Sequence, residues 1–233
     1  LSMPAKNLFR AFIAATNVVS AMFVGIGLEL PAAVLLAAAI AAWVVMGYSI
    51  PWLAVLSNPR RPILEAANGT WFIWVVASQS IAVVAAGIEP LYPEARQWLA
   101  IIAVTTWSMG VMLYAMCGLL LLFRLIMYRL EPQQLDPPYW ITMGAMAITV
   151  VAGARIVEMD DAPMIDVTRA LIAGLSVIFW AFATWLIPAL LAAGVWRHVV
   201  KRVPFRYQPT LWSFVFPMGM YAAASIYLGR ANR

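Results

Sequence analysis

The groups in this chain that could act on a solute are small and uncharged. They lie inside long apolar stretches, as Thr16 with Asn17, Ser78 with Gln79, and the small residue Gly144. Hydroxyl and amide groups in such stretches can pair across helices, which is the commoner role, or line a wet passage for a partly desolvated solute. Both interpretations stay open for each of these residues.

A bulky ring stands beside a helix-breaking residue near the end of the chain. Phe216 precedes Pro217, and Gly219 follows. Proline removes one backbone hydrogen bond and its ring presses on the preceding turn, so we expect a kink here. A ring beside a kink could form a hydrophobic constriction that gates a pore by excluding water. The alternative is packing in lipid or core, and residue chemistry taken by itself favours that alternative.

The chain lacks the groups that enzymes and metal sites use. His198 is its one histidine and Cys117 its one cysteine. His198 follows Arg197 at an expected helix end, which favours an interfacial residue over a metal ligand. The middles of the apolar stretches carry no ionisable side chain, which argues against proton pumps and retinal proteins. We expect no catalytic residue, metal, cofactor or nucleic-acid partner.

The composition indicates that membrane-spanning helices position these groups. Of 233 residues, 64% are hydrophobic and 11% charged, whereas soluble domains are about half apolar and a quarter charged. Apolar runs of this length must be helical in hydrocarbon, where every backbone group needs a partner within its own segment. The sequence predicts an all-α polytopic membrane protein, with one transmembrane domain over 1–233. Its seven spans are expected at about 8–28, 31–56, 69–87, 97–128, 138–156, 168–200 and 211–229.

The charges divide between the two sides of these spans. Ten of the fifteen Lys and Arg fall on one side: Lys6, Arg10, Arg60, Arg61, Arg124, Arg129, Arg197, Lys201, Arg202 and Arg206. Seven of the ten acids fall on the other: Glu29, Glu89, Glu94, Glu158, Asp160, Asp161 and Asp166. Because cationic loops resist translocation, the N-terminus is expected in the cytoplasm. Arg230 and Arg233 break the pattern, which fits either a further helix or two snorkelling side chains.

The same charges favour anions over cations as the solute. The expected spans hold no ring of acids of the kind that cation channels use, and basic helix ends can concentrate anions at one mouth. The orientation rule would place the basic residues there in any case, so this observation inclines toward anions without excluding other solutes.

The spans also repeat. The third, fifth and seventh are short and open on Trp71, Trp140 and Trp212, at spacings of 69 and 72 residues, while the fourth and sixth are long. A period near 70 that contains one short and one long helix predicts a hairpin repeated around an axis. The alternative is that membrane helices often begin with tryptophan.

Three segments resemble the tellurite-resistance/dicarboxylate transporter family, which includes the slow anion channels. They are residues 68–80, 137–145 and 212–221. The resemblance implies ten helices in five hairpins around a pseudo-fivefold axis, with odd helices lining a central pore, even helices outside, and a homotrimer. It also implies that a phenylalanine before the proline of the ninth helix occludes the pore. That residue falls on Phe216, with Phe214 as the alternative register.

The chain departs from the family pattern by matching only the third to ninth helices, so we expect a fragment or a partner that supplies the rest. The first hypothesis is an anion channel or transporter of the inner (plasma) membrane, for small inorganic anions or C4-dicarboxylates, in contact with lipid. The alternatives are a proton-coupled malate carrier and a remnant that does not transport.

Overall fold

The computed structural model describes residues 3–56, 64, 67–160 and 162–231. Within them the chain is helical, with no strand. The α-helices are α1 (Met3–Gly25), α2 (Glu29–Leu56), α3 (Ile73–Ile88), α4 (Arg96–Met127), α5 (Ile141–Val157), α6 (Pro163–Val195) and α7 (Trp212–Ala231). Arg60, Arg61, Asp161 and Arg233, which entered the charge argument, lie outside the described residues.

Short 3-10 turns lead into three of the odd-numbered helices. Gly69–Phe72 precedes α3, Pro137–Trp140 precedes α5, and Pro209–Leu211 precedes α7. Proline suits the first turn of a helix because its missing N–H would have no partner there. In the turn before α3, the side chain of Asn68 accepts from the backbone N–H of Thr70 at 3.0 Å. The tryptophan repeat of the sequence therefore marks three similar helix starts.

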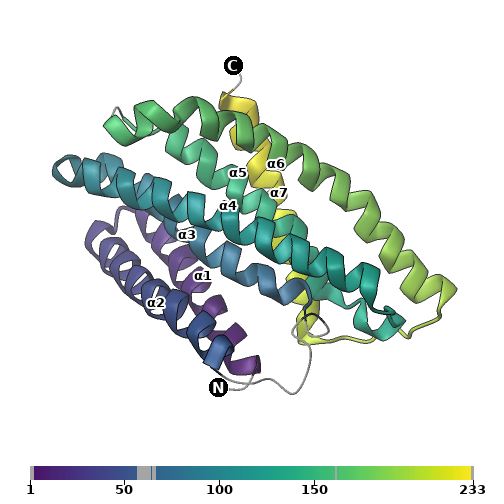
Figure 1. Cartoon of the computed structure of the whole chain (residues 1–233). Coiled ribbons are helices and arrows are strands. Elements are labelled where there is room, and N and C mark those ends of the chain that lie inside the picture. The colour runs from purple at the N-terminus through teal and green to yellow at the C-terminus, as the bar shows by residue number, and fades with distance from the viewer. Residues whose placement is uncertain (1–2, 57–63, 65–66, 161, 232–233) are drawn as a thin grey trace.

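The helices pack as hairpins whose odd members form a continuous row (Figure 1). Extensive contacts join consecutive helices as hairpins: α1 with α2, α3 with α4, and α5 with α6. Further extensive contacts join the odd helices in the order α1, α3, α5, α7. We call these four helices the inner row, and α2, α4 and α6 the outer helices. Nearly every side chain of α3 and α5 is buried, whereas the outer helices are buried along one face only.

The outer helices are longer than the inner helices with which they pair. The inner helices α3 and α5 have 16 and 17 residues, and the outer helices α4 and α6 have 32 and 33. At 1.5 Å per residue each of these two long helices is about 48 Å long, which exceeds a hydrocarbon core of about 30 Å. In Figure 1 the two long helices cross in front of α7, drawn in yellow.

The apolar helices suit a membrane. Among the described residues, six helical segments are long and apolar enough to cross one, from α2 through α7. The described side chains of α1 add a shorter apolar stretch, Ala11–Gly25. The all-α polytopic membrane fold is thus confirmed, while the pseudo-fivefold axis, the single domain over 1–233 and the bounds of the seven spans stay predictions.

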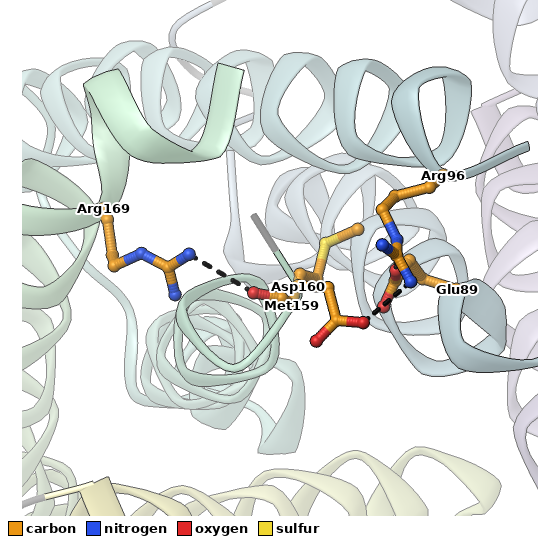
Figure 2. Close-up of polar contacts among 5 residues, drawn as sticks. All are labelled: Glu89, Arg96, Met159, Asp160 and Arg169. Carbon is orange, nitrogen blue, oxygen red and sulfur yellow. Dashed lines mark hydrogen bonds and ion pairs between the residues drawn. The ribbon is translucent and has the colours of Figure 1, made fainter. Parts of the chain in front are cut away.

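Ion pairs join two hairpins at the acidic end of the bundle (Figure 2). Arg96, at the start of α4, contacts Glu89 at 2.6 Å and Asp160 at 2.7 Å. Arg169 on α6 donates to the backbone oxygen of Met159 at 3.3 Å. The α3–α4 connection is thereby tied to the α5–α6 connection, which fixes the ends of α3 and α5 relative to each other.

Candidate functional site

Gly144 and Pro217 meet where α5 crosses α7. A Cβ placed on Gly144 would lie 2.8 Å from Cγ and 3.0 Å from Cα of Pro217. Real Cβ atoms do not approach other carbons so closely, so only glycine fits here without a shift of one helix. The α7 helix continues through Pro217, which is buried. No feature of the sequence predicted that these two residues would meet.

The two candidate gate rings have different surroundings. Phe216 is half-buried and packs against a hydrophobic cluster built around Phe72 and Ile148 of neighbouring segments. Phe214 is 39% exposed and meets the Trp140 ring edge to face, with centroids 4.5 Å apart. Phe216 therefore sits on the side of α7 that faces the inner row, and Phe214 covers the turn that leads into α5.

Asn17 and Ser78 join helices. Asn17 of α1 donates to Ser80 of α3 at 3.0 Å. Ser78 accepts from the Trp43 indole of α2 at 2.7 Å. Asn17 and Ser78 are fully buried, which matches the interhelical pairing that was one of the two interpretations. Their role in lining a pore stays a prediction.

Gln79 begins a polar chain that crosses three helices. Its amide donates to the backbone oxygen of Trp107 on α4 at 3.1 Å, and the Trp107 indole donates to the backbone oxygen of Thr149 on α5 at 3.0 Å. A Cβ on Gly110 would lie 2.4 Å from the Gln79 amide nitrogen. The Gln79 Oε1 atom is buried and has no hydrogen-bond partner among the described residues. Such an acceptor is costly to bury unless water or a solute group reaches it.

Thr16 and Gly219 complete the predicted set. Thr16 is half-buried on α1, one residue before Asn17. Gly219 is exposed on α7, and a Cβ there would meet nothing within 4 Å. The close contact of α7 with α5 therefore lies at Pro217 and not at Gly219.

Arg155 is a cation of the inner row for which the sequence argument had no role. It lies in the last turn of α5, where its guanidinium donates to the Tyr227 hydroxyl of α7 and stacks over that ring at 4.8 Å from the centroid. Its Nε is buried without a hydrogen-bond partner among the described residues. Its place near a span end made it resemble an ordinary interfacial arginine, so no sequence signal distinguished it.

Two arginines at the opposite, basic end hold the segment before α5. Arg124 at the end of α4 donates to the Tyr139 hydroxyl at 2.6 Å and to Gln134 at 3.1 Å. Arg197, beyond the end of α6, donates to the backbone oxygen of Leu135. Both side chains are buried, each 8% exposed. These charges therefore fix the entry to α5 as well as following the orientation rule.

Relatives of this chain are membrane proteins and transporters. An uncharacterized membrane protein of Mycobacterium tuberculosis is 60% identical over 119 residues, which are 51% of this chain and 60% of that protein. Two uncharacterized transporters of Methanocaldococcus jannaschii are 28% and 27% identical over 163 residues, which are 70% of this chain and 46% of each transporter. The matched regions thus cover less than two thirds of the length of each of these relatives. No solved structure gives a significant match.

A family model covers nearly the whole chain. The model described as SLAC1, voltage-dependent anion channel, matches residues 3–233. The match spans both the inner row and the outer helices, and it agrees with the resemblance carried by residues 68–80, 137–145 and 212–221. The chain therefore belongs to the voltage-dependent anion channel family.

Proposed function

We propose that this chain moves small anions across a membrane along its inner row of helices, with Phe216 as the constriction. The observation that carries the proposal is the α5–α7 contact at Gly144 and Pro217. It fixes the height of Phe216 against α5, and the half-buried ring faces the other odd helices. A large apolar ring held at a defined height is what a gate that works by excluding water requires.

The charges of the inner row support anions as the solute. Between the helix ends, the described parts of α1, α3, α5 and α7 contain no Asp or Glu. Arg155 adds a positive charge near one end of α5, without an acidic partner among the described residues. A low-dielectric passage with a cation at its entrance attracts anions and repels cations.

The setting of the chain is part of the proposal. We place it in the plasma membrane with its N-terminus in the cytoplasm, because basic residues gather at one end of the helices and acids at the other. A homotrimer is proposed from the family resemblance, and the apolar outer faces of α2, α4 and α6 are compatible with contacts to lipid or to another subunit.

A coupled carrier is the second candidate. The methanogen relatives are named as transporters, which favours a carrier over an open channel. A carrier for C4-dicarboxylates such as malate would need a coupling site. Uptake of labelled malate that collapses with the proton gradient would favour the carrier over the channel.

Anion flux from liposomes tests the proposal. The purified chain is reconstituted in vesicles loaded with potassium chloride or potassium nitrate, and loss of the internal anion is followed after dilution, with valinomycin added so that potassium carries the balancing charge. We expect chloride and nitrate to leave faster than from empty liposomes when valinomycin is present, and little loss of salt when it is absent, because the chain itself does not pass potassium. Equal rates in protein-containing and empty liposomes, with insertion shown by protease accessibility, would count against transport by this chain alone.

A further inference from the structure

A small cavity at the basic end of the bundle has a lining rich in cations. Its volume is about 20 Å³, which is enough for about one water-sized ligand. It lies between the α6–α7 connection and the turn that begins α5, with Pro137 and Phe205 among its walls. Arg197, Arg206 and His198 contribute to the lining, and no acid does.

The buried guanidinium of Arg197 is only partly satisfied. It donates to the backbone oxygen of Leu135, but its Nε is buried with no hydrogen-bond partner among the described residues. A buried charged donor without an acceptor is costly, and each such atom in a native protein calls for water or an ion that completes it. Here the donor belongs to a residue that lines a cavity of suitable size.

The backbone around the cavity has an unusual conformation. The α6 helix passes into a π-helical turn at Trp196–Val200, and Arg202 has a left-handed φ of 53°. The π-helical turn is a rare element that often occurs at functional sites, whereas the left-handed Arg202 is a common form of helix cap, in which the N–H of Val203 donates to the backbone oxygen of Arg197. Together they bend the chain so that Arg206 returns to the same cavity as Arg197.

We propose that this cavity binds a chloride-sized inorganic anion. Arg197 supplies a buried donor and fixed charge, Arg206 closes the site from the exposed side, and Gln208 offers an amide donor. Helices α5 and α7 begin at this end and α4 and α6 end there, so the helix dipoles oppose one another and the arginines supply the positive charge of the site. The site is separate from the Phe216 constriction, and its existence does not depend on transport.

A lipid phosphate could present one oxygen to the same donors. The space beside the buried donors is about the size of one water, and a phosphate group is several times larger, so we choose the smaller ligand. The two sources can be told apart in neutral detergent. Chloride can stabilise the chain there without any anionic lipid, whereas a lipid headgroup can stabilise it only when anionic lipid is added.

Melting temperature in neutral detergent tests the proposal. A ligand that binds only the folded chain raises its melting temperature in proportion to ln(1 + [L]/Kd). Chloride replaces gluconate at constant ionic strength in the full chain and in three variants: Arg206→Gln and Gln208→Glu in the cavity, and Arg129→Gln as control. Arg129 is exposed at the same end and does not line the cavity. Its replacement by glutamine therefore removes the same charge as Arg206→Gln without changing the cavity.

We expect the melting temperature of the unmodified chain to rise with chloride concentration and to reach a plateau. The Arg129→Gln variant should show the same rise. Arg206→Gln should lose more than about half of the rise and Gln208→Glu nearly all of it, because a carboxylate then competes for the donors. A rise that is equal in all four proteins would overturn the site, as would no rise in the unmodified chain. Stabilisation by phosphatidylglycerol but not by chloride would overturn the choice of ligand.

Discussion

Gly144 of α5 lies directly under the ring of Pro217 of α7, so close that a Cβ would come within 2.8 Å of the proline Cγ. Pro217 has no N–H to give to the preceding turn, and Gly144 has no side chain to keep the two backbones apart. The pair therefore sets the distance between two helices of the inner row at the height of Phe216. Because the position of this ring defines the proposed constriction, the glycine and the gate are linked.

Gly144→Ala is expected to push α5 and α7 apart. Overpacking of this kind costs about 1–3 kcal/mol, which should appear as a lower melting temperature in detergent. Gly174→Ala on α6 is the matched control, because a Cβ there meets nothing within 4 Å and alanine suits a helix interior better than glycine. If the two variants have the same stability, the close contact does not determine the packing.

The sequence was sufficient for the fold class and for the order of short and long helices. Apolar runs fix where helices cross lipid, and the tryptophan repeat marks where the inner helices begin. It was not sufficient for the partners of single polar residues. Ser78 and Gln79 are adjacent in the chain, yet one contacts Trp43 of α2 and the other contacts Trp107 of α4. Helical rotation sends neighbours to different faces, and no spacing rule names the helix that each will meet.

The surroundings of the buried arginines were even less predictable from the sequence. Arg155 and Arg197 both stand near expected span ends, where arginine is ordinary. Only the fold reveals that Arg155 faces Tyr227 of α7 and that Arg197 turns back to Leu135. Their burial depends on long-range packing, which a pattern of one segment does not contain.

Loss of the Arg155 charge should slow anion passage. In Arg155→Gln the inner row loses the cation beside Tyr227, and we expect anion flux to fall by roughly 2- to 10-fold through the weaker local potential. Arg155→Lys, which keeps the charge, should retain most of the flux. Initial rates of chloride efflux from liposomes give the comparison. Equal flux through the glutamine and lysine variants would show that the charge has no part in permeation.

The two acids that share Arg96 should differ in their contribution to stability. Glu89 is 1% exposed in its side chain, and Asp160 is 65% exposed. Glu89→Gln is therefore expected to cost about 1–3 kcal/mol, and Asp160→Asn about 0–1 kcal/mol because water and salt screen the exposed pair. Unfolding by denaturant in detergent measures both, and the double variant measures their coupling. A larger loss for Asp160→Asn would contradict the burial argument.

Asp136 should make stability depend on pH. Burial raises the pKa of this carboxyl above its usual value, against the opposing effects of a backbone hydrogen bond and of Arg197 and Arg124. A carboxyl whose pKa is raised in the folded state holds its proton more tightly there, so its contribution to stability is lost as pH rises above the usual pKa of 3.8. Asp136→Asn should remove this loss.

The measurement is melting temperature against pH for the two proteins. The difference between Asp136→Asn and the unmodified chain is expected to be smallest in acid and to grow toward neutral pH in favour of asparagine. The opposite trend would mean that the two arginines outweigh burial at this carboxyl.

Anion conductance through Phe216→Ala in planar bilayers tests the proposed gate, with Phe214→Ala as the register control. Removing the half-buried ring should widen the constriction, so we expect a several-fold larger chloride current in Phe216→Ala and little change in Phe214→Ala. An unchanged current in Phe216→Ala, from protein shown to be inserted and folded, would contradict the proposed gate.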